Sequence, residues 1–173
     1  MKGFKEIGRS RYITDAEFNQ VKAHAHFTVI DAMDIALLKG QRPADVLKLK
    51  RSDIRDVALW IVQNKTGARL GIEITGELAT VINRINKSPR RAIGAYLVQD
   101  ENGQPLSKDA MRSRFAKART AAGVDFQFRD IRAKAATDTG DLAHSQALLG
   151  HKNREMTERY VKTRSGHRTK PLR

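Results

Sequence analysis

The fold and function of this chain turn on one stretch, Leu148-Leu149-Gly150-His151-Lys152-Asn153-Arg154-Glu155-Met156-Thr157-Glu158-Arg159-Tyr160. It combines a Leu-Leu-Gly-His turn with a tyrosine nine residues after the histidine, and its polar residues predict a short helix that carries Tyr160. A phenol with its ordinary pKa of about 10 is a poor nucleophile at pH 7. It becomes useful where positive charge stabilises the phenolate and the transition state. A source of such charge elsewhere in the chain would make Tyr160 a candidate nucleophile.

The composition supplies that charge. Lys and Arg number 33 against 19 Asp and Glu, which gives a formal net charge of +14 over 173 residues. An excess of this size indicates a polyanionic partner, most often nucleic acid, with a basic solvated surface as the alternative. The length fits one domain that can bury a real core.

Several classes of protein are excluded or disfavoured. Cysteine is absent, which excludes disulfides and thiolate chemistry. The sequence has no run of 18 apolar residues and no apolar signal core at its start, so we expect a soluble intracellular protein without a membrane partner.

The first third of the chain predicts three helices. A capping box at Thr14 to Glu17 opens a helix that runs to about residue 25. Residues 28–39 are apolar almost all round and predict a central buried helix that ends at Gly40. Pro43 fits the first turn of the next helix. Arg42 would be held rigidly between these two helices, or would be an ordinary surface arginine.

The middle of the chain predicts a hairpin between helices. Residues 53–63 form a turn and a strand, residues 64–67 a hairpin turn, and residues 69–75 the return strand. Lys65 then lies at the hairpin tip, where a long cation can reach into a groove, although a turn lysine is usually just solvated. Residues 76–86 predict an amphipathic helix, and residues 95–98 a short third strand.

The last third predicts three more helices before a flexible tail. A helix from Ser107 has an apolar stripe, and basic residues on its other faces are either solvated or in contact with phosphates: Lys108, Arg112, Arg114, Lys117 and Arg119. A helix from Phe128 to about residue 139 places Arg129 and Arg132 three residues apart on one face. Residues 142–149 form a short helix that leads into the Leu-Leu-Gly-His turn.

Five pieces of the chain, in this order, resemble the catalytic domain of the tyrosine recombinase (phage integrase) family. They are Lys39-Gly40-Gln41-Arg42-Pro43-Ala44-Asp45, Asn64-Lys65-Thr66-Gly67, Phe128-Arg129-Asp130-Ile131-Arg132, Leu148-Leu149-Gly150-His151-Lys152 and Tyr160. The resemblance covers residues 13–162. It implies an α+β fold, mainly α, with a small antiparallel sheet packed against a helical core.

The resemblance also implies a role for each matched residue. Tyr160 would attack the scissile DNA phosphate and form a 3′-phosphotyrosyl bond, which later permits strand exchange and religation without metal, ATP or other cofactor. Arg42 and Arg132 would bind the non-bridging oxygens, for which the planar guanidinium is well suited. Lys65 would protonate the leaving 5′-oxygen, and His151 would donate a hydrogen bond to the phosphate.

Arg129 departs from the family pattern, which usually has His and sometimes Lys three residues before the second arginine. Arginine cannot serve as a general base near neutral pH, so Arg129 would either contribute charge only or point away from the pocket. The family further implies double-stranded DNA as partner, tetramers on DNA, accessory DNA-bending proteins, and a cytoplasmic location in a bacterial or phage-infected cell. A separate DNA-binding domain generally precedes the catalytic one, and residues 1–12 are interpreted as a linker or arm, with residues 163–173 as a flexible basic tail.

Two alternatives to a strand-exchange enzyme stay open. One is a non-catalytic DNA-binding remnant of an integrase, in which Arg42, Lys65 and Arg132 are only phosphate contacts. The other is a type IB topoisomerase-like enzyme or telomere resolvase, which shares the chemistry but relaxes or seals DNA.

Overall fold

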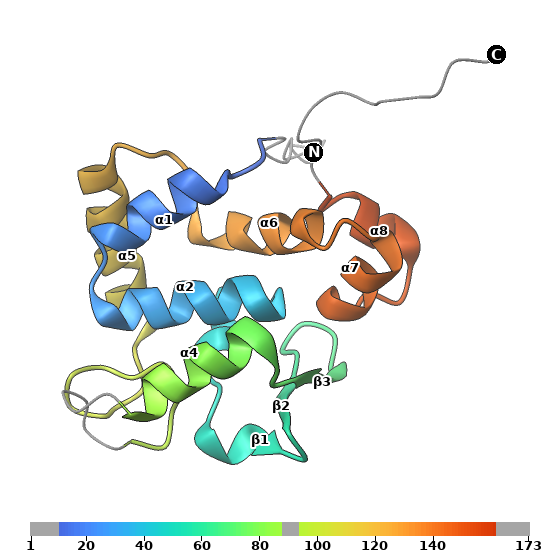
Figure 1. The fold of residues 1–173 in the computed structure, drawn as a ribbon, viewed down its shortest axis with the longest axis horizontal. Helices are drawn as coiled ribbons and strands as arrows, with labels where there is room; N and C mark the ends of the chain where they lie inside the picture. Colours follow the sequence, from blue (N-terminus) through green and yellow to red (C-terminus); the bar gives the residue numbers. More distant parts are fainter. Residues whose placement is uncertain (1–10, 88–93, 162–173) are drawn as a thin grey trace, which may run out of the picture.

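A computed structural model describes residues 11–87 and 94–161 of the chain. The tail predicted over residues 163–173 lies outside these residues, as does nearly all of the linker predicted over residues 1–12. The described part is a helical domain with one small sheet, as the sequence predicts (Figure 1).

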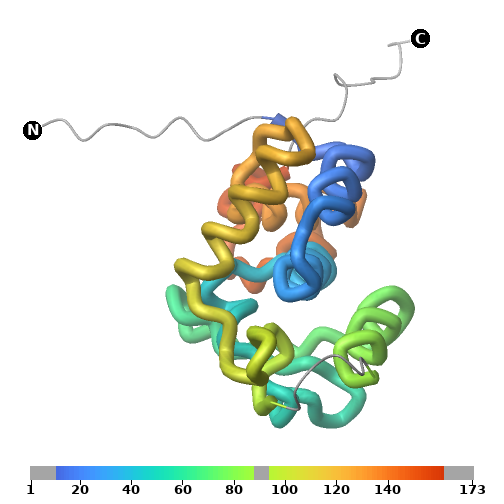
Figure 2. The backbone as a smooth tube through the Cα atoms, turned by 90° about the vertical axis from the view of Figure 1, so that its left-hand side faces the viewer, coloured from blue at the N-terminus to red at the C-terminus, as the bar shows by residue number. Residues whose placement is uncertain are grey.

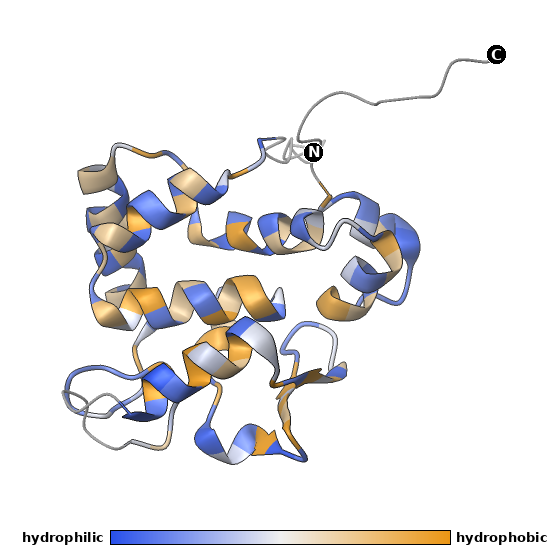
Figure 3. Ribbon diagram, viewed as in Figure 1, coloured by the Kyte–Doolittle hydropathy of each residue, from blue (hydrophilic) through white to orange (hydrophobic). Residues whose placement is uncertain are grey.

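The helix α2 (Phe27–Lys39) is the centre of the domain. Its mean hydropathy is high, and Figure 3 shows hydrophobic residues recurring along its length. The helix ends because Gly40 adopts the left-handed conformation with φ 60°, which permits a tight turn into α3 (Pro43–Leu47). The helix before it, α1 (Asp15–Ala23), begins with the predicted capping box, in which Thr14 and Glu17 exchange hydrogen bonds.

The other helices pack around α2. They are α4 (Gly76–Lys87), α5 (Lys108–Ala122), α6 (Ile131–Asp138), α7 (Leu142–Leu149) and α8 (Arg154–Glu158). In Figure 1, α1 and α6 lie on one side of α2 and α4 on the other, while α7 and α8 lie beyond the C-terminal end of α2. Figure 2 shows α5 running along one edge of the domain. This arrangement lets the long side chain of Arg132, from the first turn of α6, contact the ends of α2 and α7.

The sheet has three antiparallel strands, β1 (Ile54–Arg55), β2 (Ala58–Val62) and β3 (Arg69–Glu73), in the order β1-β2-β3. Leu59 pairs with Ile72 and points into the core, whereas Trp60 pairs with Gly71 on the exposed face. A buried lysine joins the sheet to the central helix, because Lys39 Nζ donates to the carbonyl of Leu59 at 2.5 Å. Burial lowers the pKa of Lys39 to about 7.

The prediction of a third strand at residues 95–98 is wrong. Within this segment only Tyr96 forms a bridge, an isolated one to Lys50, and a second isolated bridge, from Gln99 to Pro105, lies just beyond it. Leu97 and Val98 are both buried, whereas a strand on one face of a sheet would bury alternate residues. The apolar residues therefore reflect a packed loop, and the third strand is β1, which is too short to leave a pattern in the sequence.

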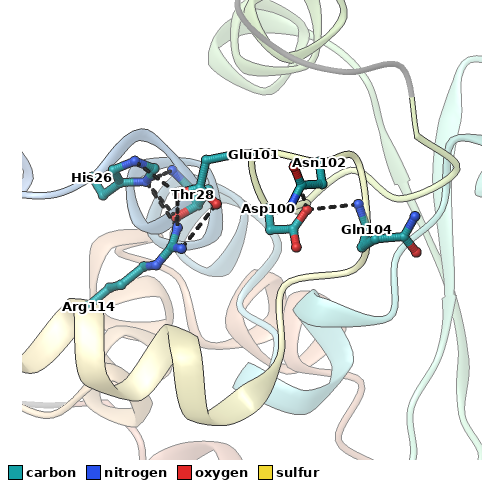
Figure 4. Close-up of polar contacts among 7 residues, drawn as sticks. All are labelled: His26, Thr28, Asp100, Glu101, Asn102, Gln104 and Arg114. Carbon is teal, nitrogen blue, oxygen red and sulfur yellow. Dashed lines mark hydrogen bonds and ion pairs between the residues drawn. The ribbon is translucent and has the colours of Figure 1, made fainter.

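The loop after residue 98 is fixed to the start of α2 by polar contacts (Figure 4). His26 accepts the N–H of Thr28 as the helix cap, and Arg114 from α5 donates to the Thr28 hydroxyl at 3.0 Å. Arg114 also forms an ion pair with Glu101, 2.9 Å away. Asp100 closes the same loop by accepting the N–H groups of Asn102 and Gln104. Arg114 is thus engaged in holding the fold, unlike the exposed Lys108, Arg112 and Lys117 of the same helix.

The two-residue turn between β1 and β2 is strained. Asp56 and Val57 have φ values of 51° and 56°, the conformation that a tight hairpin turn requires and that a β-branched residue strongly disfavours. The Val57 side chain is 73% exposed, so it gains little from burial. We expect Val57→Gly to raise the free energy of unfolding by about 1 kcal/mol, since the left-handed conformation costs an L-residue about 1–2 kcal/mol. Urea unfolding would measure the change.

Val62 provides the matched control for this substitution. It is also an exposed valine, but it lies within the regular strand β2. Val62→Gly should lower the stability, because glycine weakens a strand that has no need of positive φ. A loss of stability in both variants would mean that the turn at Val57 is not strained.

Candidate active site

Arg132 lies in the first turn of α6 and is the centre of a buried polar cluster. Its side chain is buried, with a residue exposure of 2%, and its guanidinium donates to the carbonyls of Gly40 at 2.5 Å and Leu149 at 2.9 Å. One of the same nitrogens lies 3.1 Å from Nε2 of His151. The guanidinium carbon lies 5.3 Å from the centre of the Tyr160 ring. Arg132 therefore joins the ends of α2 and α7 to the candidate nucleophile.

His151 follows Gly150, which has φ 67° and approaches the sheet so closely that a Cβ would lie 2.6 Å from the Leu70 side chain. The pKa of His151 falls to about 4, because of burial and then the charges of Arg132 and Arg42, so the ring is neutral at pH 7. Arginine can only donate, which makes Nε2 the acceptor and places the proton on Nδ1. Nδ1 then donates to the Thr157 hydroxyl, 3.1 Å away.

Arg42 caps α3 and stands next to this cluster. Burial, and then the positive charge of Arg42, lower the pKa of Arg132 to about 10. Among the described residues, NH1 of Arg42 and Nε of Arg132 are buried nitrogens without a hydrogen-bond acceptor. Two buried donors on two mutually repelling cations form a site that an anion would stabilise.

Tyr160 lies at the rim of the cluster. Its ring centre is 5.3 Å from that of His151, and its side chain is half-buried. The prediction that a short helix carries Tyr160 needs a correction, because α8 ends at Glu158 and Tyr160 lies in the turn that follows. Its N–H donates to the carbonyl of Thr157 at 2.8 Å.

The structure brings together four of the six predicted site residues. Lys65 is exposed at the tip of the β2–β3 hairpin and makes no hydrogen bond or ion pair within the described part of the chain. In Figure 1 this hairpin reaches toward α7. Arg129 is exposed in a short 3-10 helix (Phe128–Asp130), whereas Arg132 is buried, so the prediction that the two share one face does not hold.

Arg129 instead lines a groove of about 600 Å³ between α5 and the start of α6. Pro43, the neighbour of Arg42, contributes to its wall, so the groove begins beside the cluster. Its other cationic residues are Lys108, Arg112 and Arg119. The groove thus extends the positive charge of the cluster along α5.

The sequence did not single out several buried polar residues that support the site. Asp45 accepts the N–H of Asn64 at 2.9 Å and so holds the base of the Lys65 hairpin. Gln41 and Gln63 hydrogen bond to each other, and Thr157 orients His151. The sequence could have pointed to these residues only through their positions. Gln41, Asp45 and Gln63 flank predicted site residues, and Thr157 lies three residues before Tyr160.

Residues 11–87 and 94–161 contain no group of three or more His, Asp or Glu side chains that could hold a metal ion. None of the helices in these ranges has the length and apolar character needed to cross a membrane.

The fold is that of an integrase catalytic core. The solved structure of the lambda integrase catalytic core matches with a TM-score of 0.72 and 26% identity, over 83% of this chain and 92% of that one. A lambda integrase tetramer bound to a Holliday junction matches with a TM-score of 0.79 and 24% identity, over 92% of this chain and 50% of that one.

Sequence comparison agrees. Residues 13–167 match the model of the phage integrase family, and the chain belongs to that family. The integrase of Escherichia phage HK022 is 33% identical over 146 residues, which are 77% of this chain and 41% of the relative. The chain spans less than half the length of the curated relatives that it matches.

The state of His151 gives a direct check on the cluster. We expect a neutral Nδ1–H ring at pH 7 with a titration midpoint near pH 4, measured by ¹⁵N NMR of histidine-labelled protein. Arg132→Met should raise the midpoint toward the ordinary value of about 6.5, because a nearby like charge is lost. Arg114→Met, on the far side of the domain, should leave it unchanged. A ring protonated on Nε2 would contradict the assigned hydrogen bonds.

Proposed function

We propose that this chain is the catalytic part of a site-specific DNA recombinase that cuts and rejoins DNA through Tyr160. The observation that carries the proposal is the pair of buried guanidinium nitrogens without acceptors on Arg42 and Arg132, together with the Arg132 guanidinium 5.3 Å from the centre of the Tyr160 ring. A phosphodiester offers the two non-bridging oxygens that such donors need. Family membership and the likeness to the lambda integrase catalytic core support the same reading.

The chemistry follows from this geometry. The phenol oxygen of Tyr160 attacks phosphorus, the bond from phosphorus to the 5′-oxygen breaks, and the electron pair leaves with that oxygen. The phenol proton passes to water, since Tyr160 is half-exposed, and the product is a 3′-phosphotyrosyl bond with a free 5′-hydroxyl. Arg42 and Arg132 neutralise the charge that grows on the non-bridging oxygens. Reversal of the same steps by another 5′-hydroxyl rejoins strands without an external energy source.

Lys65 supplies the proton to the leaving oxygen. Its exposed position at a hairpin tip allows it to approach DNA that lies across the site, and an ammonium is a suitable general acid. His151 holds Arg132 in place through Nε2, and the predicted hydrogen bond from His151 to the phosphate requires its proton to move from Nδ1 to Nε2 when DNA binds. Arg129 adds charge at the mouth of the groove and has no role as a base.

DNA binds across the cationic groove of α5. Lys108 and Arg112 are exposed there, and Arg129 continues the same groove toward Arg42. With a formal charge of +14, affinity should be strongly electrostatic, with a logarithmic salt slope of roughly −0.9 per phosphate neutralised. We propose that the chain acts on cellular DNA in the cytoplasm as a tetramer, by analogy with the lambda integrase tetramer solved on a Holliday junction, with accessory DNA-bending proteins as partners.

We also propose the organisation of the chain. Residues 13–162 form the catalytic domain, residues 1–12 a linker or arm, and residues 163–173 a basic tail.

The test is covalent trapping on nicked DNA. A pool of duplexes with randomised sequence and a nick in one strand lets the short cleaved fragment diffuse away, so that a protein–DNA adduct accumulates. We expect an adduct that resists denaturing electrophoresis and forms equally well in EDTA. Binding without any adduct would instead support the non-catalytic remnant. An adduct with no four-way junction products from intact sites would favour a topoisomerase-like enzyme.

A further inference from the structure

Two buried glutamines connect the hairpin that carries Lys65 to the arginine cluster. Both Gln41 and Gln63 are 1% exposed. Nε2 of Gln63 donates to Oε1 of Gln41 at 2.8 Å and to the carbonyl of Leu149 at 2.9 Å. Nε2 of Gln41 donates to the carbonyls of Lys39 at 2.8 Å and Leu148 at 3.1 Å. Both N–H groups of each amide are therefore satisfied, and the carbonyl acceptors fix the orientation of both side chains.

The carbonyl of Leu149 is shared between this pair and the cluster. Arg132 donates to it at 2.9 Å, the same distance as Gln63. One backbone oxygen thus sets the position of the hairpin base and of the phosphate-binding arginine at once. Gly150 permits this close packing, because a Cβ there would lie 3.3 Å from Nε2 of Gln63 and would collide with Leu70.

Lys65 depends on the hairpin for its position. Gln63 is two residues before Lys65, and its Oε1 accepts from the hydroxyl of Thr66, the residue after Lys65, at 2.8 Å. The backbone of Gln63 also closes the turn, with its N–H donating to Ala68 and its carbonyl accepting from Gly67. Since the side chain of Lys65 makes no hydrogen bond or ion pair with the described residues, the backbone of this turn determines where its ammonium lies.

We propose that Gln41 and Gln63 are positioning residues that hold the Lys65 hairpin in register with the Arg42–Arg132 site, so that the general acid meets the leaving 5′-oxygen. This inference rests on the proposed function. It assigns the pair to one step, proton transfer to the leaving group, rather than to phosphate binding. A placement error of about 1 Å is enough to slow such a step about 100-fold.

The test compares two leaving groups. The DNA probe is the sequence most enriched by covalent trapping from the randomised nicked pool, prepared once with an ordinary 5′-oxygen at the scissile phosphate and once with sulfur in that position. A thiol has a pKa of about 8.5, so sulfur leaves as a thiolate without a general acid. A defect limited to proton delivery is therefore rescued by sulfur, whereas a defect in phosphate binding or in folding is not.

We expect Gln63→Met to slow formation of the adduct on the oxygen substrate by about 10–100-fold, because a displaced general acid loses only part of the about 10²–10⁴-fold that general acid catalysis provides. On the sulfur substrate its rate should stay within about threefold of the unaltered chain. Lys65→Ala should give the same pattern with a larger loss. Gln99→Met serves as control, since Gln99 is equally buried at 2% exposure but bonds to Gly94 in a different loop.

The outcomes distinguish a failure of the positioning role of Gln41 and Gln63 from a failure of the proposed recombinase function. Equal slowing on both substrates, or no slowing on either, by Gln63→Met overturns the positioning role and leaves the proposed function intact. No adduct from the unaltered chain on either substrate overturns the proposed function itself. If Gln63→Met does not fold, the double variant Gln41→Met with Gln63→Met removes both partners and leaves neither amide unpaired. The same rescue by sulfur is then required of the double variant.

Discussion

Replacing Arg132 by methionine is expected to slow formation of the covalent complex about 1,000-fold, since one preorganised donor alone contributes about 10²–10³-fold. The effect should be at the upper end because Arg132 is buried and charged, and because it contacts Gly40, Leu149 and His151. Arg132→Lys should lose nearly as much. An ammonium keeps the charge but cannot span the same set of acceptors as a planar guanidinium. Single-turnover cleavage of a nicked duplex would measure both variants.

Arg114→Met is the control that shows whether the loss of any one positive charge is enough to slow cleavage. Arg114 pairs with Glu101 at the N-terminal end of α2 (Figure 4), whereas Arg132 contacts Gly40 at the opposite end. Replacement of Arg114 should change the cleavage rate by less than about threefold at saturating DNA. Thermal unfolding of each variant verifies that the protein is folded at the assay temperature. An Arg132→Met variant that is folded and cleaves at the unaltered rate would contradict the proposed phosphate site.

The second large effect is expected at Tyr160. Tyr160→Phe should form no covalent complex while it binds DNA with unchanged affinity, since only the attacking oxygen is lost. The ring should keep its place 5.3 Å from both the His151 ring and the Arg132 guanidinium, because these two ring contacts remain when the hydroxyl and its hydrogen bond with Arg132 are lost. Gel-shift titration and covalent trapping on the same duplex measure the two properties. Weaker binding of the Phe variant would instead assign the hydroxyl to DNA contact.

Most of the helical framework is predictable from the sequence, because its signals are local. The capping box at Thr14, the left-handed glycine at position 40 and the proline at position 43 each fix a helix boundary within a few residues. The hairpin around Lys65 is predictable for the same reason, since alternation and a turn sequence both lie within it.

Tertiary context decides what could not be predicted. Residues 95–98 have the composition of a strand, yet Leu97 pairs its N–H with Leu49 in a packed loop. Two-residue strands such as Ile54–Arg55 leave no period to detect. Spacing suggests that Arg129 and Arg132 share a face, but Arg129 lies in the 3-10 helix before α6 and is exposed, whereas Arg132 is buried among carbonyls from distant parts of the chain.

The candidate site also has one part that local motifs predict and another part that tertiary contacts determine. Each predicted residue comes with a local motif, and the structure gathers Arg42, Arg132, His151 and Tyr160. The supporting residues Gln41, Gln63 and Thr157 have no motif of their own, because their partners are backbone carbonyls and side chains from distant parts of the chain. The proton on Nδ1 of His151 likewise follows only from the position of Arg132.

The central claim is that Tyr160 becomes joined to the 3′-phosphate of DNA. The direct measurement is to trap the protein on nicked DNA, trim the DNA with nuclease, digest the protein, and locate the remaining nucleotide by mass spectrometry. Among Tyr12, Tyr96 and Tyr160, which are the three tyrosines of the chain, we expect the nucleotide on Tyr160 alone, attached through its 3′-phosphate. A nucleotide on Tyr12, on Tyr96 or on any other residue, or attachment through a 5′-phosphate, would contradict this account.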